Sequence, residues 1–133
     1  AAGIGTLALA AALLVFAAYG GSRDYRITVG GDTVAIDAVL YDRTIRREQV
    51  VSVSEIEQLP HGTRTNGFGG VNQSYGHFVI DGYGACMVYV YNQVRPCIVI
   101  RLRDGGPACV IVNGKTAEET QALYRTLSQW LSP

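Results

Sequence analysis

The sequence predicts a mainly β domain of the α+β class, in which about seven antiparallel strands form a barrel or sandwich capped by one C-terminal amphipathic helix. Three observations predict this fold: short runs with apolar residues at every second position, glycine-rich turns between the runs, and one stretch of helical spacing at the end of the chain. The 133 residues provide for one domain with one core.

The N-terminal segment, residues 1–19, is apolar and contains no charged residue. As a helix it would be about 28 Å long, close to the thickness of the hydrocarbon core of a bilayer. We therefore expect an apolar, transmembrane-type helix over residues 1–21, followed by the strand-rich domain over residues 22–133. The core of a signal peptide and a buried helix of a soluble protein are the two alternatives.

Two arginines, Arg23 and Arg26, follow this segment. Under the positive-inside rule, arginines on this flank favour a C-terminal domain on the cytoplasmic side. The expected localisation is therefore the membrane, with a single transmembrane helix or the last of several, and with the domain in the cytoplasm.

The expected strands are alternating or short apolar runs bounded by turns. Gly30-Gly31-Asp32 predicts a hairpin between the first two strands, and Asp104-Gly105-Gly106-Pro107 predicts a tight turn before the last one. The polar residues 42–49 are interpreted as a connection. The seven expected strands cover residues 25–29, 33–41, 50–59, 77–81, 85–92, 97–103 and 108–113.

The C-terminal helix begins at a capping box, Thr116-Ala117-Glu118-Glu119. In such a box the Thr116 hydroxyl accepts a hydrogen bond from the amide of Glu119, whose side chain reaches back. Apolar residues then recur at helical spacing as far as Leu131. This apolar stripe needs a hydrophobic partner, and the open mouth of the predicted barrel would be one.

Residues 60–76 are rich in glycine and asparagine and contain almost no aliphatic side chains, which predicts a long loop. Consecutive flexible residues can turn their backbone amides inward to bind an anion, and an arginine adds positive charge. A plain solvated loop is the alternative. The candidate ligand-binding residues are therefore Arg64, Thr65, Asn66 and Gly67, together with Arg95 in the turn before Pro96.

A set of short motifs occurs in a fixed order along the chain: Thr65-Asn66-Gly67, Gly76-His77-Phe78, Val88-Tyr89-Val90, Pro96-Cys97-Ile98-Val99-Ile100, Val112-Asn113 and Thr120-Gln121-Ala122-Leu123-Tyr124. Together with the strands and the capped helix, this set resembles the bacterial pleckstrin-homology-like (PH-like) domain family from Tyr25 to Leu131. The resemblance implies a seven-stranded PH-like barrel closed by the helix, a position beside one or two membrane helices, and no established enzymatic activity.

Phosphoinositide-binding relatives of that family use lysines and arginines around the loop between the first two strands. Here that loop is Gly30-Gly31-Asp32 and contains no basic residue, so phosphoinositide binding is not expected. The nearest basic group, Arg43, Arg46 and Arg47, lies one connection later. Under a bilayer these arginines would contact anionic lipid headgroups. A solvated turn is the alternative.

Composition excludes further classes of function. Zero formal net charge argues against a nucleic-acid partner, because nucleic-acid binding needs a basic face. The spacing of the two histidines and three cysteines matches no zinc signature, and no motif for a catalytic nucleophile or a nucleotide cofactor is present, so no metal, cofactor or catalytic residue is expected. The cysteines Cys86, Cys97 and Cys109 suit buried reduced thiols, with a Cys97–Cys109 bridge as the alternative.

The sequence thus favours a membrane-anchored PH-like binding or assembly module without catalytic activity. Its expected partners are the membrane, through residues 1–19, and either a second copy of the chain or another membrane protein. The first alternative is a module that binds an anion or a lipid headgroup through residues 60–76. The second alternative is an enzyme, secreted or of uncharacterised activity.

Overall fold

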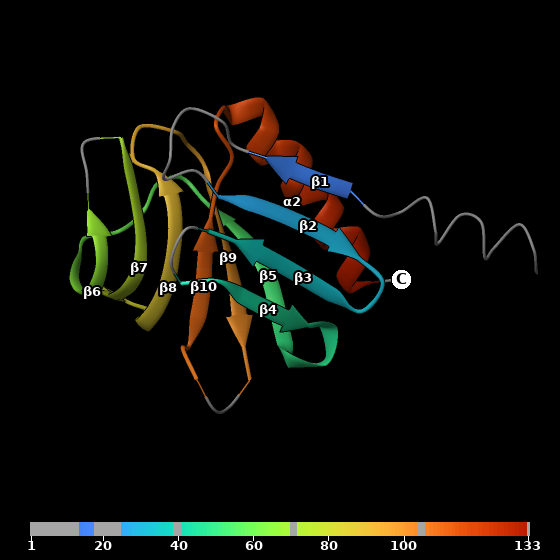
Figure 1. Cartoon of the computed structure of the whole chain (residues 1–133), viewed down its shortest axis with the longest axis horizontal. Coiled ribbons are helices and arrows are strands. Elements are labelled where there is room, and N and C mark those ends of the chain that lie inside the picture. The colour runs from blue at the N-terminus through green and yellow to red at the C-terminus, as the bar shows by residue number, and fades with distance from the viewer. Residues whose placement is uncertain (1–13, 18–24, 39–40, 70–71, 104–105, 133) are drawn as a thin grey trace, which may run out of the picture.

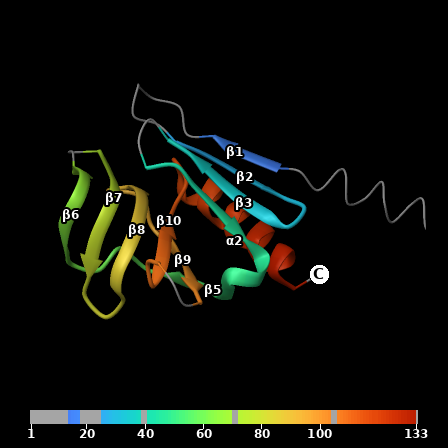
Figure 2. The same ribbon diagram turned by 60° about the horizontal axis from the view of Figure 1, so that its bottom comes forward.

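Two β-sheets and one C-terminal helix make up the residues that the computed structural model describes, namely 14–17, 25–38, 41–69, 72–103 and 106–132 (Figure 1). The two sheets form layers, and the helix lies against β5, β2 and β9 at one end of the layers (Figure 2). This arrangement confirms the mainly β class with a C-terminal helix.

The four-stranded sheet has the order β1-β2-β3-β4, and all its neighbouring strands are antiparallel. Its strands are β1 (Leu14–Ala17), β2 (Arg26–Gly30), β3 (Thr33–Asp37) and β4 (Arg43–Arg46). Alternate side chains on one face are buried, as the two-residue period of a strand requires: Ile27, Val29, Val34, Ile36 and Ile45. The predicted hairpin between β2 and β3 is confirmed, and Gly31 at its turn has a φ of 55°, which favours glycine.

The six-stranded sheet has the order β5-β9-β10-β8-β7-β6. Its strands are β5 (Val50–Ile56), β6 (Gly62–Gly69), β7 (Gln73–Ile80), β8 (Gly84–Tyr91), β9 (Cys97–Leu102) and β10 (Cys109–Val112). Neighbouring strands are antiparallel except β8 and β10, which are parallel. The exception follows from the topology, because β10 returns antiparallel to β9 into the place between β9 and β8.

The edge strands of this sheet, β5 and β6, follow one another in the chain and are joined by residues 57–61 alone. A flat six-stranded sheet would place its edges about 24 Å apart, whereas a linker of this length spans about 21 Å when fully extended. The sheet must therefore curve. A second core lies on its face away from the four-stranded sheet, and its buried members are Ile80, Cys86, Val88, Val90, Cys97, Val99, Cys109 and Ile111.

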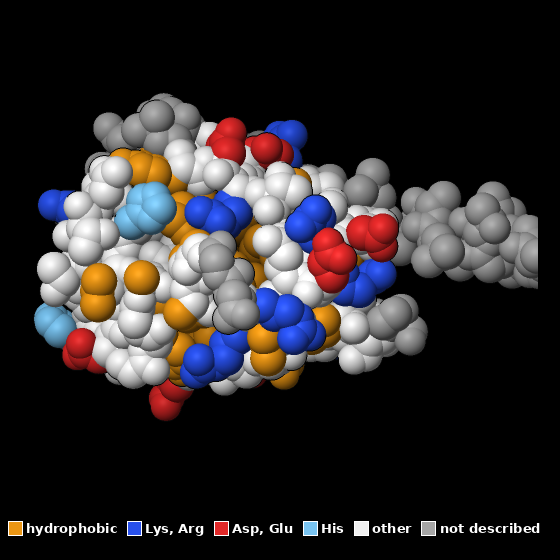
Figure 3. Space-filling model, turned by 90° about the horizontal axis from the view of Figure 1, so that it is seen from below, with side chains coloured by type: hydrophobic (Ala, Val, Ile, Leu, Met, Phe, Trp, Pro, Cys, Tyr) orange, Lys and Arg blue, Asp and Glu red, His pale blue; other side chains and the backbone are white. Residues whose placement is uncertain are grey.

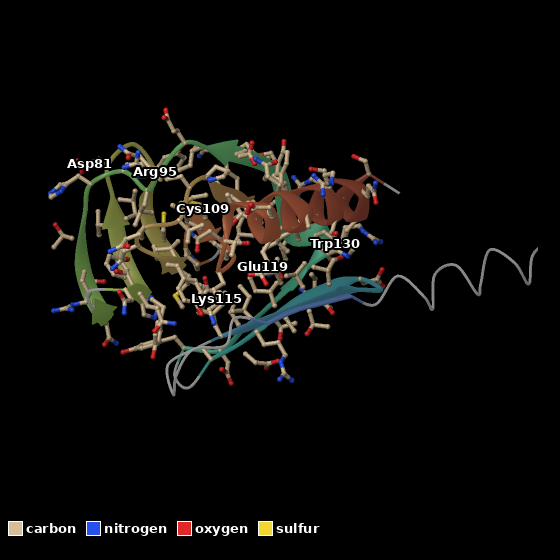
Figure 4. All side chains as sticks on the ribbon, turned by 90° about the horizontal axis from the view of Figure 1, so that it is seen from above. Asp81, Arg95, Cys109, Lys115, Glu119 and Trp130 are labelled. Atoms are coloured by element: carbon tan, nitrogen blue, oxygen red, sulfur yellow. The ribbon has the colours of Figure 1, made fainter. Side chains whose placement is uncertain are left out.

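The main core lies between the two sheets and the helix α2 (Ala117–Leu131). Leu123, Leu127 and Trp130 of the helix are buried there. The Thr116 hydroxyl accepts the Glu119 amide at 3.1 Å, which confirms the predicted N-cap. The Glu119 carboxylate accepts the backbone amide of Lys115 at 2.8 Å, one residue earlier than a capping box places it (Figure 4).

A buried asparagine ties the two sheets together. The Asn113 side-chain amide donates to the carbonyl oxygens of Tyr91 and Val94 at 3.0 and 3.1 Å, and its Oδ1 accepts the Tyr91 amide at 2.7 Å. The hydroxyl of Tyr25, which immediately precedes β2 of the four-stranded sheet, donates to the backbone oxygen of Asn113 at 2.7 Å. Asn113 thereby fixes the end of β10 to the turn after β8 and to the opposite sheet.

Three expectations need correction. The described residues form ten strands rather than seven, and one pair of strands is parallel, so the seven-stranded antiparallel barrel is wrong in detail. The long loop over residues 60–76 is wrong, because most of these residues belong to the hairpin of β6 and β7. The polar connection over residues 42–49 is also wrong, since it holds β4 and the 3₁₀ helix η1 (Arg47–Gln49).

The apolar helix expected over residues 1–21 falls mostly outside the described residues. Its four described residues, Leu14–Ala17, form strand β1 and pair with β2, so a helix is wrong for them. Within the described part of the chain, no helix combines the length and the apolar character needed to cross a membrane.

Candidate functional site

The side chain of Arg43 points into the space between the two sheets. It pairs with the buried Ile36 of β3 and lies two residues before the buried Ile45, so strand alternation turns it inward. Its Nε atom is buried, and no hydrogen-bond partner for it is present among the described residues. A buried guanidinium nitrogen ordinarily has an acceptor, so this position is a candidate site for an anionic or carbonyl group.

Tyr89 of β8 faces Arg43 from the other sheet. The side chain is fully buried, and its hydroxyl donates to the backbone oxygen of Tyr41. Burial raises the pKa of the Tyr89 phenol above its ordinary value; the positive charge of Arg43 opposes this shift, and the carboxylate of Asp42 adds to it. Tyr89 is therefore a neutral hydrogen-bond donor, and we assign it no role as a base.

Tyr41 links the four-stranded sheet to the β6–β7 hairpin. Its φ of 68° is unusual for a residue other than glycine, and it turns the chain just before β4. Its ring lies edge-on to the rings of Tyr75 and His77, with centroids 6.4 and 5.8 Å apart, and its hydroxyl donates to Oδ1 of Asn66 at 3.0 Å. We call Tyr41, Arg43, Asn66, Tyr75, His77 and Tyr89 the intersheet cluster.

The β6–β7 hairpin extends beyond the area that the four-stranded sheet covers (Figure 1). Along β7, Tyr75 is buried, His77 is half-buried and Val79 is 46% exposed, although all three lie on the same face of the strand. Val79 is opposite Thr63 of the edge strand β6, which is also exposed. Seen from below, the molecule presents basic and histidine side chains among hydrophobic ones (Figure 3).

The four ligand-binding residues predicted in the loop lie on strand β6 instead. Arg64, Thr65 and Asn66 are exposed, a bulge separates Arg64 from Asn66, and the Thr65 hydroxyl donates to the backbone oxygen of His77 at 3.2 Å. Gly67 lies so close to β7 that an added Cβ would be 2.5 Å from the Tyr75 oxygen. Paired strand backbone is extended, so the predicted anion nest does not form there, and only Asn66 belongs to the intersheet cluster.

The fifth predicted residue, Arg95, lies apart from that hairpin segment, between β8 and β9. It lines a small cavity of about 170 Å³ together with Gln58, Leu59, Asn92 and Cys97, among others. Burial raises the pKa of the Cys97 thiol to about 11, and the positive charge of Arg95 opposes this shift. This volume is below that of an ordinary small-molecule site, so the cavity carries no functional assignment.

The three arginines predicted to contact a membrane have three different environments. Arg43 faces inward, and Arg46 is exposed and forms an ion pair with Glu48 at 3.3 Å. Arg47 donates to the backbone oxygens of Trp130 and Gly31, both at 2.9 Å, and pairs with Asp32 at 3.2 Å. Only Arg46 extends from β4 into solvent, so the structure does not unite the three arginines in one basic patch.

Sequence reasoning missed the role of the tyrosines and placed Arg43 in a polar connection. The sequence did contain one indication. Ile45 is the sole aliphatic residue between Asp42 and Gln49, and Arg43 lies two residues before it, so the two side chains would share one face of a strand. Within the described residues, no three His, Cys, Asp or Glu side chains gather in a way that could hold a metal ion.

A comparison with protein-family models matches residues 25–123 to the model described as "Bacterial PH domain". The match covers more than half of the chain and extends from the residue before β2 into α2. Comparisons with curated proteins and with solved structures gave no match.

Proposed function

The chain belongs to the bacterial PH domain family, and from that premise we propose that it is a binding module that mediates protein–protein interaction through self-association, without catalysis. The observation that carries this proposal is the exposed valine Val79 beside the edge strand β6. An apolar side chain next to a strand edge is the combination that a second sheet or strand covers.

The hairpin offers both kinds of contact that a second copy needs. Within the described residues, β6 pairs with β7 on one side only, and four successive side chains, Thr63 to Asn66, are exposed. A twofold axis through this edge would place each hairpin against the same hairpin of the second copy. The bulge between Arg64 and Asn66 interrupts the edge, so we expect a weak, concentration-dependent dimer.

Sedimentation equilibrium across a range of concentrations tests this proposal. The variant Val79→Lys should shift the chain to monomer, because the charge would be buried at the interface. Val51→Lys is the matched control, since Val51 is the other large hydrophobic side chain that is exposed among the described residues, 52% against 46%, and lies on β5 at the opposite edge. A chain that is monomeric at every concentration, or equally affected by both variants, contradicts self-association.

A second candidate function, anion binding, rests on the buried Nε of Arg43. An anion with oxygen acceptors would satisfy this nitrogen, and the Tyr89 hydroxyl and the half-buried His77 lie in the same cluster. Thermal unfolding with increasing inorganic phosphate should show stabilisation that Arg43→Gln removes and Arg46→Gln keeps. Vesicles with anionic lipid headgroups form the second arm, with Arg64→Ala and Asn66→Ala. Unchanged stability and binding in all variants would exclude this candidate.

We also propose that residues 1–19 anchor the chain to a membrane. Strand β1 constrains this anchor, because residues that pair with β2 cannot at the same time lie within a bilayer. Flotation of the full chain with lipid vesicles, compared with a chain that starts at residue 22, tests the anchor. Equal flotation of both chains would show that these residues do not provide it.

A further inference from the structure

Two cysteine thiols lie side by side in the second core. Cys86 of β8 and Cys109 of β10 are directly opposite each other in the parallel pairing of these strands. Their Sγ atoms are 2.8 Å apart, and both side chains are buried. Neighbouring strands are about 4.8 Å apart, which falls within the range of Cα separations, roughly 4.4–6.8 Å, that a disulfide bridges.

The third cysteine is separated from this pair. Cys97 begins β9, and the pairing of β9 with β10 sets Cys109 opposite Arg101, four residues further along β9. Cys97 and Cys109 are therefore about 13 Å apart along the strands. The Sγ of Cys97 instead accepts the side-chain amide of Asn113 at 3.8 Å, at the other end of β10. A Cys97–Cys109 bridge, the alternative considered from the sequence, does not fit this register.

We propose that Cys86 and Cys109 are a redox-active pair that closes to an intramolecular disulfide when the protein meets a hydroperoxide. The pairing register and the short distance between the sulfur atoms carry this inference, which is independent of the proposed binding function. The positive charge of Arg101 on the neighbouring strand favours the ionised form of either thiol.

The two thiols and one molecule of hydrogen peroxide are the only reactants that the oxidation needs. The hydrogen bond from the Cys86 thiol lowers the pKa of Cys109, so the Cys109 thiolate attacks one peroxide oxygen. The O–O bond breaks, Cys109 becomes a sulfenic acid, and the departing hydroxide takes up the proton that Cys109 lost. The Cys86 sulfur then attacks the Cys109 sulfur. The S–S bond forms, the S–O bond breaks, and the leaving hydroxide takes the Cys86 proton as a second water.

The position of the pair in the sheet gives a small oxidant a route. Cys109 is the first residue of β10, and Cys86 is the third residue of β8, just after the turn that includes Tyr83 (Cys109 is labelled in Figure 4). The neighbouring residues Gly84, Ala85 and Ala108 are exposed. Opening of the strand ends would expose the sulfur atoms without unfolding the centre of the sheet. The disulfide would then lock the parallel junction of β8 and β10.

To test this proposal, the full, reduced chain is treated with hydrogen peroxide and then denatured, and its remaining free thiols are alkylated. Mass spectrometry then gives the mass of the chain and identifies the peptides that are linked by a disulfide. The expected product has lost two hydrogen atoms, carries one alkyl group on Cys97, and yields a peptide that links Cys86 to Cys109. A reducing phosphine should restore three alkylated cysteines. Cys97→Ser should oxidise in the same way, whereas Cys86→Ser should form no intramolecular disulfide.

Several outcomes would overturn the proposal. These are a bridge that includes Cys97, independent oxidation of the thiols to sulfinic acids, or no reaction under conditions in which the urea-unfolded chain oxidises. The peptide map of the unaltered chain distinguishes these outcomes and does not depend on the folding of any cysteine variant.

Discussion

The guanidinium group of Arg47 lies over the indole ring of Trp130, with its Cζ atom 5.2 Å from the ring centroid. Both residues also bond to the same turn: Arg47 and the Trp130 indole nitrogen each donate to the backbone oxygen of Gly31, at 2.9 and 3.0 Å. These contacts join the end of α2 to the hairpin of β2 and β3. Arg47 therefore holds the end of the helix against the hairpin, which explains why its guanidinium group does not extend freely into solvent.

Arg47→Ala should lower the free energy of unfolding by about 2 kcal/mol, because it removes a cation–π contact and charged hydrogen bonds to two backbone oxygens. Arg46→Ala is the control. Arg46 is exposed and pairs only with the exposed Glu48 among the described residues, so its loss should cost less than about 0.5 kcal/mol. Urea unfolding followed by circular dichroism measures both values. Similar values for the two variants would contradict the structural role of Arg47.

Asn113→Ala should destabilise the domain by about 2–3 kcal/mol, because the Tyr91 amide and the Val94 carbonyl lose their Asn113 partner at a part-buried site, while the Tyr91 carbonyl keeps only its bond from the Val94 amide. Asn72→Ala is the control, because Asn72 is exposed. The midpoint of urea unfolding, with an unchanged slope, is the measurement. A midpoint close to that of the control would mean that water replaces the asparagine amide.

The strands that the sequence predicted well carry a clear apolar pattern. In β3, Val34 and Ile36 alternate with more exposed residues, as expected for a strand with one buried face. In β8 and β9 the apolar runs around Val88 and Ile98 are continuous, because these strands are buried on both faces. The helix was equally clear, since Thr116 and the apolar stripe fix its start and its buried face.

Strand β6 could not be predicted in the same way. Its sequence, Gly62–Gly69, has the composition of a loop, and the segment is a strand because β7 pairs with it along its length. Pairing between strands is a tertiary effect that overrides local propensity. The intersheet cluster was missed for a related reason: Tyr41 and Asn66 are distant in sequence and meet only when the β6–β7 hairpin reaches the turn that contains Tyr41.

Raising the pH should destabilise the domain through Cys97. Burial raises the pKa of this thiol from 9.0 to about 11, and the hydrogen bond from Asn113 opposes part of the shift. Between pH 9 and 11 the unfolded chain loses this proton while the folded chain keeps it, so stability is present below pH 9 and falls as pH rises through that window. The loss amounts to roughly 2–3 kcal/mol.

Urea unfolding of the unaltered chain and of Cys97→Ala, at several values between pH 8 and 11, isolates this contribution. Other groups titrate alike in both chains, so the difference between the two free energies should change by that amount across the window. A difference that stays constant with pH would show that Cys97 ionises equally in the folded and unfolded states.

The glycine Gly76 of β7 sets how closely β6 approaches. Its φ is 119°, and an added Cβ would lie 2.5 Å from the Gly67 Cα and 2.7 Å from the Asn66 oxygen, both backbone atoms that cannot move aside alone. Gly76→Ala should therefore displace β6 and break the hydrogen bond between Tyr41 and Asn66. Gly82→Ala is the matched control, because Gly82 also has a positive φ, 84°, but has open space around its Cβ position.

In both variants the free energy of unfolding should fall by about 1–2 kcal/mol, because alanine is strained at a positive φ. Gly76→Ala alone should add the cost of the steric contact, and it alone should speed hydrogen exchange of the amides of β6, measured by nuclear magnetic resonance. Since the proposed dimer uses the same edge, Gly76→Ala should also weaken self-association while Gly82→Ala leaves it intact. Equal exchange rates in both variants would mean that β6 holds its position without the close contact at Gly76, and the intersheet cluster would then not depend on it.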